Sequence, residues 1–180
     1  MITKMKPDKP KFLYHASPNN DIEILDPRAK SFPDDWENRE VVFATQSPQY
    51  ASFFIVPTTD VWASMGTLGT IFYFVCADKK SFMEKDVGGT IYKLPPDSFY
   101  HHEGYEWYST ESVKPIDKKY IKSGLDHMIE NGVQVYFVDE DTLKKIRASK
   151  DHGASMLNSM VSDNEKRNLN VKIFDIRKKK

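Results

Sequence analysis

Two short apolar runs decide the fold: Phe12-Leu13-Tyr14-His15-Ala16-Ser17 and, one strand and loop later, Val41-Val42-Phe43-Ala44-Thr45. Each run ends in small polar residues, as a buried strand does when its end opens into a pocket. The imidazole of His15 lies at such an end, where it can form a hydrogen bond to a ligand. The two runs therefore predict two buried strands that end at a binding pocket.

Other segments give the outline of the remaining fold. Strands are predicted over 11–15, 40–44, 70–77, 90–94, 105–109, 113–120, 133–138 and 169–176, with a short strand or turn over 21–25. Helices are predicted over 47–56, 123–131 and 141–149, the last with Asp141 as its N-cap, and a helix over 150–160 is left open. Residues 28–39 are predicted to be a loop, and 61–65 a short helix or an irregular segment.

The order of these segments predicts the fold class. The strands come in runs and do not alternate with long helices, which favours an α+β fold with a mainly antiparallel sheet over a doubly wound parallel one. A chain of 180 residues is long enough for one domain with a real core. We expect a single domain over 11–177, a flexible basic tail over 1–10, and a second basic tail over 178–180.

Composition excludes several classes of protein. Lys and Arg number 26, as do Asp and Glu, so no global field would attract nucleic acid or an anionic membrane. The single cysteine, Cys76, sits in an apolar strand and predicts a buried, inert thiol. No apolar run approaches the roughly 18 to 20 residues of a membrane span, and residues 1–11 contain no apolar signal-peptide core. The expectation is a cytoplasmic protein with neither a membrane nor a nucleic acid as its partner.

Few motifs of known chemistry occur in the sequence. Phosphate-binding glycine motifs, HExxH, CxxC and Gly-x-Ser-x-Gly are all missing. The adjacent pair His101-His102 lacks a third spaced ligand, so no metal site is predicted. One acidic residue, Glu106, lies inside an aromatic strand, where a carboxylate is costly unless it faces a pocket, a partner or the solvent.

Three blocks of this sequence together resemble the ADP-ribosyltransferase superfamily, in its His-Tyr-Glu branch, which includes poly(ADP-ribose) polymerases and diphtheria toxin. Tyr14-His15-Ala16-Ser17 is similar to the first-strand block, and Val42-Phe43-Ala44-Thr45 with Tyr50 is similar to the second. Glu106-Trp107-Tyr108, followed by Tyr120-Ile121, is similar to the third. The blocks cover about a quarter of the chain, in the family's order and spacing. The resemblance implies a split β-sheet core with short peripheral helices.

The resemblance also implies a site for NAD as substrate, with ADP-ribose passed to an unknown macromolecular or small-molecule acceptor or to water. His15 would bind the nicotinamide ribose, Ala16 and Ser17 the carboxamide, and Tyr50 the nicotinamide ring, while Glu106 would bind a ribose hydroxyl and polarise the acceptor. Phe43 and Ala44 belong to the second block and are assigned to the same site.

Two positions differ from the family pattern, and one assignment is open. Val42 stands at the position of the family's second-strand tyrosine, and Ala16 at that of a glycine. Glu111 competes with Glu106 as the catalytic acid; on a regular strand the two would face opposite sides, so that one of them faces the pocket.

Other functions are compatible with the same blocks. The fold could bind NAD, ADP-ribose or another nucleotide without catalysis. It could transfer a 2'-phosphate from RNA to NAD, although Arg28 and Arg39 are the only arginines before residue 147. It could also be an α+β domain of unrelated function.

Overall fold

The structure is a computed structural model that describes residues 7–28, 40–160 and 173–177. Its strands are β1 Leu13–Ser17, β2 Val42–Thr45, β3 Ala63–Leu68, β4 Ile71–Cys76, β5 Gly89–Leu94, β6 Tyr100–His101, β7 Glu106–Ser109, β8 Asp117–Ile121, β9 Gln134–Phe137 and β10 Ile173–Asp175. Its helices are α1 Pro48–Ser52, α2 Lys79–Lys85, α3 Gly124–Glu130, α4 Glu140–Ala148 and α5 Ala154–Met160. The loop predicted over 28–39 and the two predicted tails fall largely outside the described residues.

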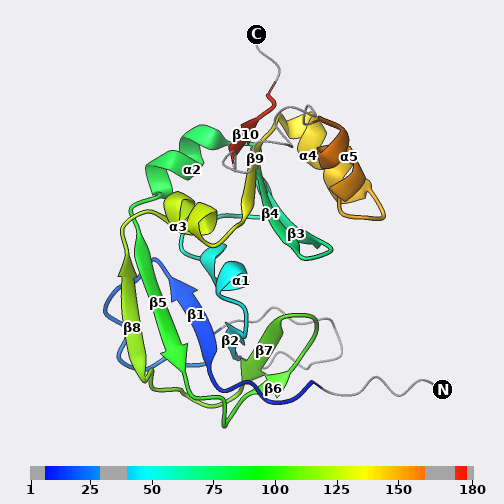
Figure 1. Ribbon diagram of the computed structural model, residues 1–180. Helices are drawn as coiled ribbons and strands as arrows, with labels where there is room; N and C mark the ends of the chain where they lie inside the picture. Colours follow the sequence, from blue (N-terminus) through cyan, green and yellow to red (C-terminus); the bar gives the residue numbers. More distant parts are fainter. Residues whose placement is uncertain (1–6, 29–39, 161–172, 178–180) are drawn as a thin grey trace, which may run out of the picture.

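The strands form two sheets (Figure 1). The larger sheet has the order β6-β7-β2-β1-β5-β8, and every pairing in it is antiparallel. The smaller sheet has the order β10-β9-β4-β3, with two parallel pairings and an antiparallel pairing between β3 and β4. The prediction of an α+β fold with a mainly antiparallel sheet and short helices is therefore confirmed.

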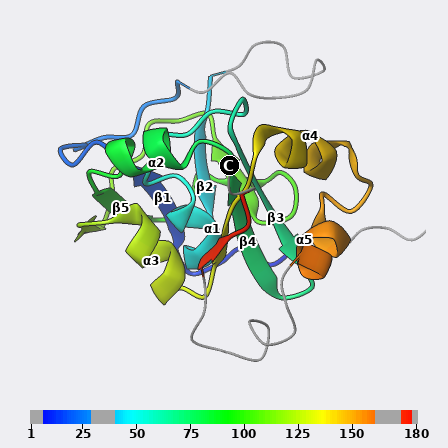
Figure 2. The same cartoon turned by 90° about the horizontal axis from the view of Figure 1, so that it is seen from above.

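Strand β4 is buried on both of its faces. Phe72, Phe74 and Cys76 point into one hydrophobic cluster, whereas Tyr73 and Val75 point into another. Helices α2 and α3 lie on one side of this strand, and α4 and α5 lie on the other (Figure 2). This double coverage explains why the strand is almost continuously apolar, and its place inside the smaller sheet agrees with the predicted central position.

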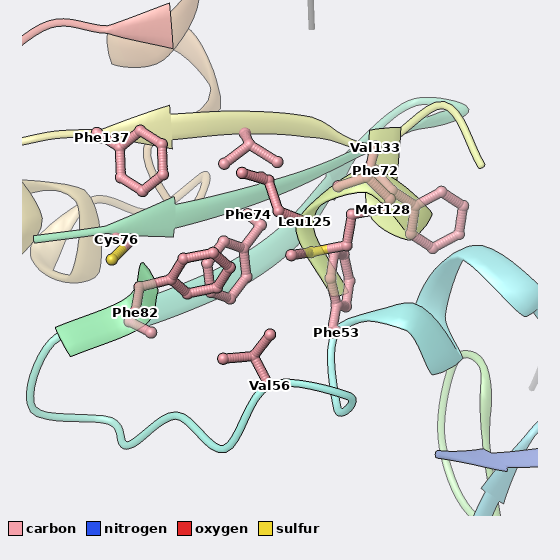
Figure 3. Close-up of a cluster of buried hydrophobic side chains, with 12 residues drawn as sticks. Phe53, Val56, Phe72, Phe74, Cys76, Phe82, Leu125, Met128, Val133 and Phe137 are labelled. Carbon is pink, nitrogen blue, oxygen red and sulfur yellow. The ribbon is translucent and has the colours of Figure 1, made fainter. Parts of the chain in front are cut away.

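The segment that follows α1 is packed against both sheets. Phe53 and Val56 belong to the cluster with Phe74 and Met128, which is shown in Figure 3. Ile55, between them, packs instead against the larger sheet through Ala16 and Ile121. Full burial of each large side chain stabilises the fold by roughly 1.5–3 kcal/mol. Helix α1 is thereby held between the sheets, where Figure 1 shows it.

Several predicted elements differ from the observed ones. Residues 61–65 were expected to be helical or irregular, but β3 begins at Ala63 and pairs with β4 along its whole length. Helix α2 was not predicted, since only one of its residues, Phe82, is buried. The N-cap of α4 is Asp139, whose side chain accepts a hydrogen bond from the amide of Thr142, in place of Asp141. Helix α1 ends at Ser52, before the predicted end at residue 56.

Candidate functional site

A cavity of about 820 Å³ lies where β1, β2 and β7 meet α1, and it extends to β3 and α4. In Figure 1, α1 lies between strands β1 and β2 on one side and β3 on the other. The volume falls in the upper part of the range of about 300–1,000 Å³ that is usual for ligand pockets. Both sheets contribute residues to its lining, so the site depends on the packing that holds α1 between them.

His15 is fixed in one tautomer by the main chain of β2. Its Nδ1 lies 2.7 Å from the carbonyl oxygen of Phe43, and because a carbonyl can only accept, Nδ1 must donate. Burial lowers the pKa of His15, which the hydrogen bond to the Phe43 carbonyl opposes. The neutral ring therefore keeps an unprotonated Nε2, which no hydrogen bond from a described residue engages. This nitrogen can accept a hydrogen bond from a hydroxyl group of a ligand.

Glu106 is held by Tyr50 across the same cavity. The phenol of Tyr50 donates a hydrogen bond of 2.6 Å to Oε1 of Glu106. Burial raises the pKa of Tyr50, and the neighbouring Glu106 carboxylate raises it further, so the phenol keeps its proton. Among the described residues, no side chain or amide donates to the second oxygen, Oε2. One carboxylate oxygen is therefore positioned by the protein, and the other is left for a ligand.

The register of the larger sheet determines which residues lie beside Glu106. Thr45 pairs with Glu106 across β2 and β7, and it also pairs with Tyr14 across β2 and β1. Opposite residues share a face, so Tyr14, Thr45 and Glu106 form one row. His15 is the next residue and would face away in a regular strand. However, β1 and β2 pair only through Tyr14 and Thr45, so the two strands are not paired at His15. The His15 ring lies beside the Phe43 carbonyl of β2 and lines the same cavity.

Aromatic side chains supply much of the cavity surface. Tyr14, Phe43, Tyr50 and Phe54 all line it. The Tyr50 ring stacks on Tyr105 with centroids 6.0 Å apart and planes inclined by 29°. Tyr50 also contacts the rings of Phe53 and Phe54, with centroids 5.7 and 5.6 Å away, so it belongs to an aromatic cluster at the wall of the cavity. Such surfaces suit a flat heteroaromatic ring.

The structure brings together six of the seven predicted site residues. The residues that line the cavity are His15, Ala16, Phe43, Ala44, Tyr50 and Glu106. Ser17 does not line it, and its hydroxyl accepts a hydrogen bond from the Asn19 amide in a local turn. Glu111 is exposed and also outside the lining, so of these two glutamates only Glu106 lines the cavity. Val42 is buried in the core of the larger sheet.

Sequence reasoning did not assign several lining residues. Tyr14 and Thr45 belong to the motifs quoted above and line the cavity. Assigning them to the site requires the register of β1, β2 and β7, which places both residues in one row with Glu106. Asp60, Ser64 and Arg147 come from the segment before β3, from β3 itself and from α4. No local pattern marks these three, because their place in the site follows only from the packing of the two sheets.

The described residues contain neither a metal-binding cluster nor a membrane-spanning helix. No group of three or more His, Cys, Asp and Glu side chains in this part of the chain is arranged to hold a metal ion. No helix in the same residues has the length and apolar character needed to cross a membrane. Comparison with models of protein families, with curated proteins and with solved structures finds no match to this chain.

Proposed function

We propose that the cavity binds NAD and that the protein transfers ADP-ribose from NAD to an acceptor or to water. The observation that carries this proposal is the pair of open acceptor atoms, His15 Nε2 and Glu106 Oε2, in one aromatic-lined cavity. Two such acceptors suit the hydroxyl groups of a ribose. The aromatic surface beside them suits the nicotinamide ring.

The chemistry follows from the charge of the leaving group. When the bond between ribose C1' and the nicotinamide nitrogen breaks, its electron pair goes to the nicotinamide, which leaves as a neutral molecule. Positive charge then develops at C1' and the ring oxygen, and the Glu106 carboxylate stabilises it. The oxygen of water or an acceptor nucleophile adds to C1' and loses a proton, which Glu106 can accept.

His15 serves as an orienting group in this scheme. Its Nε2 accepts a hydrogen bond from a ribose hydroxyl, and the Phe43 carbonyl keeps the ring in the required tautomer. Tyr50 contributes its hydroxyl to Glu106 and its ring to the aromatic lining of the cavity. Tyr14 and Phe43 add aromatic surface, so that the valine at position 42 does not leave the cavity without rings.

The decisive experiment measures nicotinamide release from NAD. Wild type is expected to release nicotinamide. In Glu106→Gln the rate of release should be at least about 100-fold lower, because an amide cannot stabilise the developing positive charge. Glu111→Gln is the matched control: it neutralises an exposed carboxylate five residues away, outside the cavity, and should keep the wild-type rate.

Other outcomes point to the alternative functions. A thermal shift with NAD or ADP-ribose but no nicotinamide release would indicate a binding module that lacks catalysis. Wild-type activity in Glu106→Gln would remove Glu106 from the mechanism, and an equal loss in Glu111→Gln would show that the loss is not specific to the cavity. Transfer of a phosphate from RNA is less compatible with the site, because Arg147 is the only Lys or Arg among the described residues that line the cavity.

A further inference from the structure

One cation lies at the end of the cavity formed by the smaller sheet. Arg147 belongs to the last turn of α4, and its Nη2 donates a hydrogen bond of 2.6 Å to the carbonyl oxygen of Ala63 in β3. Both residues line the cavity. The hydrogen bond spans 84 positions in the sequence and fixes the guanidinium beside the edge strand β3.

Among the described residues, no carboxylate forms an ion pair with Arg147, whereas Arg177 and Lys79 both pair with Asp175. Asp60 also lines the cavity, but it forms no such pair with Arg147 either. A guanidinium carries five N–H donors, and one of them is used by Ala63. The remaining donors can bind an anion.

The distribution of charge in the cavity restricts where an anionic group can bind. Glu106 and Asp60 are its carboxylates, and Arg147 is its only permanent cation in the described part of the chain. A negatively charged group of a ligand is therefore disfavoured near Glu106 and Asp60 and favoured near Arg147. The hydroxyl groups of Thr58 and Ser64 also line the cavity and can add donors for phosphate oxygens. Arginine suits phosphate because its planar fork can donate two parallel hydrogen bonds.

We infer that Arg147 binds the diphosphate of a dinucleotide whose nicotinamide ribose lies between His15 and Glu106. This inference rests on the proposed function and assigns to the ligand a direction within the cavity. The ribose and nicotinamide lie toward β1, β2 and β7, and the phosphates lie toward β3 and α4. Arg147 is then a specificity-determining residue that separates diphosphate-containing ligands from nicotinamide alone.

The test compares ligands with and without phosphate in calorimetric titrations of the full chain. Arg147→Gln should weaken binding of ADP-ribose about tenfold or more, the effect of losing a charge-assisted hydrogen bond, and should leave binding of nicotinamide unchanged. Arg147→Lys keeps the positive charge but loses the planar guanidinium. Its affinity for ADP-ribose should lie between those of wild type and Arg147→Gln. Lys144→Gln, an exposed cation on the same helix but outside the cavity, should bind both ligands as wild type does.

The results separate this inference from the proposed function. Equal weakening of nicotinamide and ADP-ribose by Arg147→Gln would show that Arg147 only braces α4 against β3, and would overturn the inference. Nicotinamide release from NAD with an unchanged KM in Arg147→Gln would overturn it as well, while the proposed function stands. Binding of ADP-ribose that depends on Arg147, without any release of nicotinamide, would support the inference and reject the enzymatic proposal. Failure of both ligands to bind wild type would overturn both.

Discussion

Replacing Tyr50 by phenylalanine separates the two contributions that this residue makes to the cavity. The substitution removes the hydroxyl that donates to Glu106 and keeps the ring, with its contacts to Phe53, Phe54 and Tyr105. A hydrogen bond to a charged group contributes about 1.5–3 kcal/mol. Both partners are half-buried, so water can replace part of the interaction. We expect a loss of about 1 kcal/mol in the free energy of unfolding.

The assay combines chemical and thermal denaturation with steady-state turnover. For a chain of this size, about 1 kcal/mol corresponds to a decrease of about 2–4 °C in Tm. If Tyr50 positions Glu106, then kcat should fall about fivefold to tenfold in Tyr50→Phe, with KM nearly unchanged because the ring remains. Tyr105→Phe is the matched control, since it removes a hydroxyl from the ring stacked on Tyr50 and should change stability by less than about 0.5 kcal/mol.

A double-mutant cycle shows whether the two side chains act together. The cycle uses Tyr50→Phe, Glu106→Ala and the double variant, and the expected coupling is about 1 kcal/mol. Additive changes in unfolding free energy, together with an unchanged kcat in Tyr50→Phe, would refute the assigned role of the Tyr50 hydroxyl. A large increase in KM with the same kcat would instead show that this hydroxyl contributes to binding NAD.

Two further predictions concern stability. His15 has a lowered pKa in the folded chain, so below its unfolded value of 6.5 the unfolded state binds more protons, and the free energy of unfolding falls with falling pH. The assay is urea denaturation at about pH 7.5 and about pH 5.5. Between these pH values the free energy of unfolding should fall less in His15→Gln than in wild type, by up to about 1.4 kcal/mol per pH unit. Equal decreases in the two proteins would contradict this. Asp86 accepts hydrogen bonds from Ser123 Oγ and from the amides of Gly124 and Leu125 at the start of α3, so Asp86→Ala should cost about 2 kcal/mol in the same assay. Asp126→Ala, an exposed acid in the first turn of α3, should cost less than about 1 kcal/mol, and equal costs would reject the capping role of Asp86.

The sequence predicted elements well where one pattern dominates. The apolar run 70–77 became β4, and Ser123 with Gly132 enclosed α3 as expected, with Gly132 at a φ of 78° after the helix. Strand β3 was missed because its residues neither alternate nor cluster. It exists through its pairing with β4, and Gly66 leaves the space that the Tyr73 side chain occupies. Pairing of this kind is a tertiary effect that no local window contains.

The residues of the candidate site also fall into two groups, those that a local motif predicts and those that only tertiary packing brings to the cavity. His15, Tyr50 and Glu106 were predicted because each lies in one of the three short blocks that resemble the ADP-ribosyltransferase superfamily. Arg147 was not predicted, because it stands on an exposed helical surface and reaches the cavity only when α4 packs against β3. The choice between Glu106 and Glu111 also required the structure, since the register of β2 and β7 places only Glu106 in the row with Thr45.

The parallel pairing of β9 with both β4 and β10 determines the order in which the molecule can be completed during synthesis. The last strand of the larger sheet ends at residue 121, whereas the smaller sheet needs residues 134–137 and 173–175. A nascent chain can therefore pair all strands of the larger sheet while β3 and β4 still lack their neighbour. Phe74 can already pack on Phe53 and Phe82, but Val75 lacks Leu143, Ile146 and Leu157 of its cluster until α4 and α5 emerge after β9. Such long-range parallel pairing is slow, and this interval is when the chain is most exposed to aggregation.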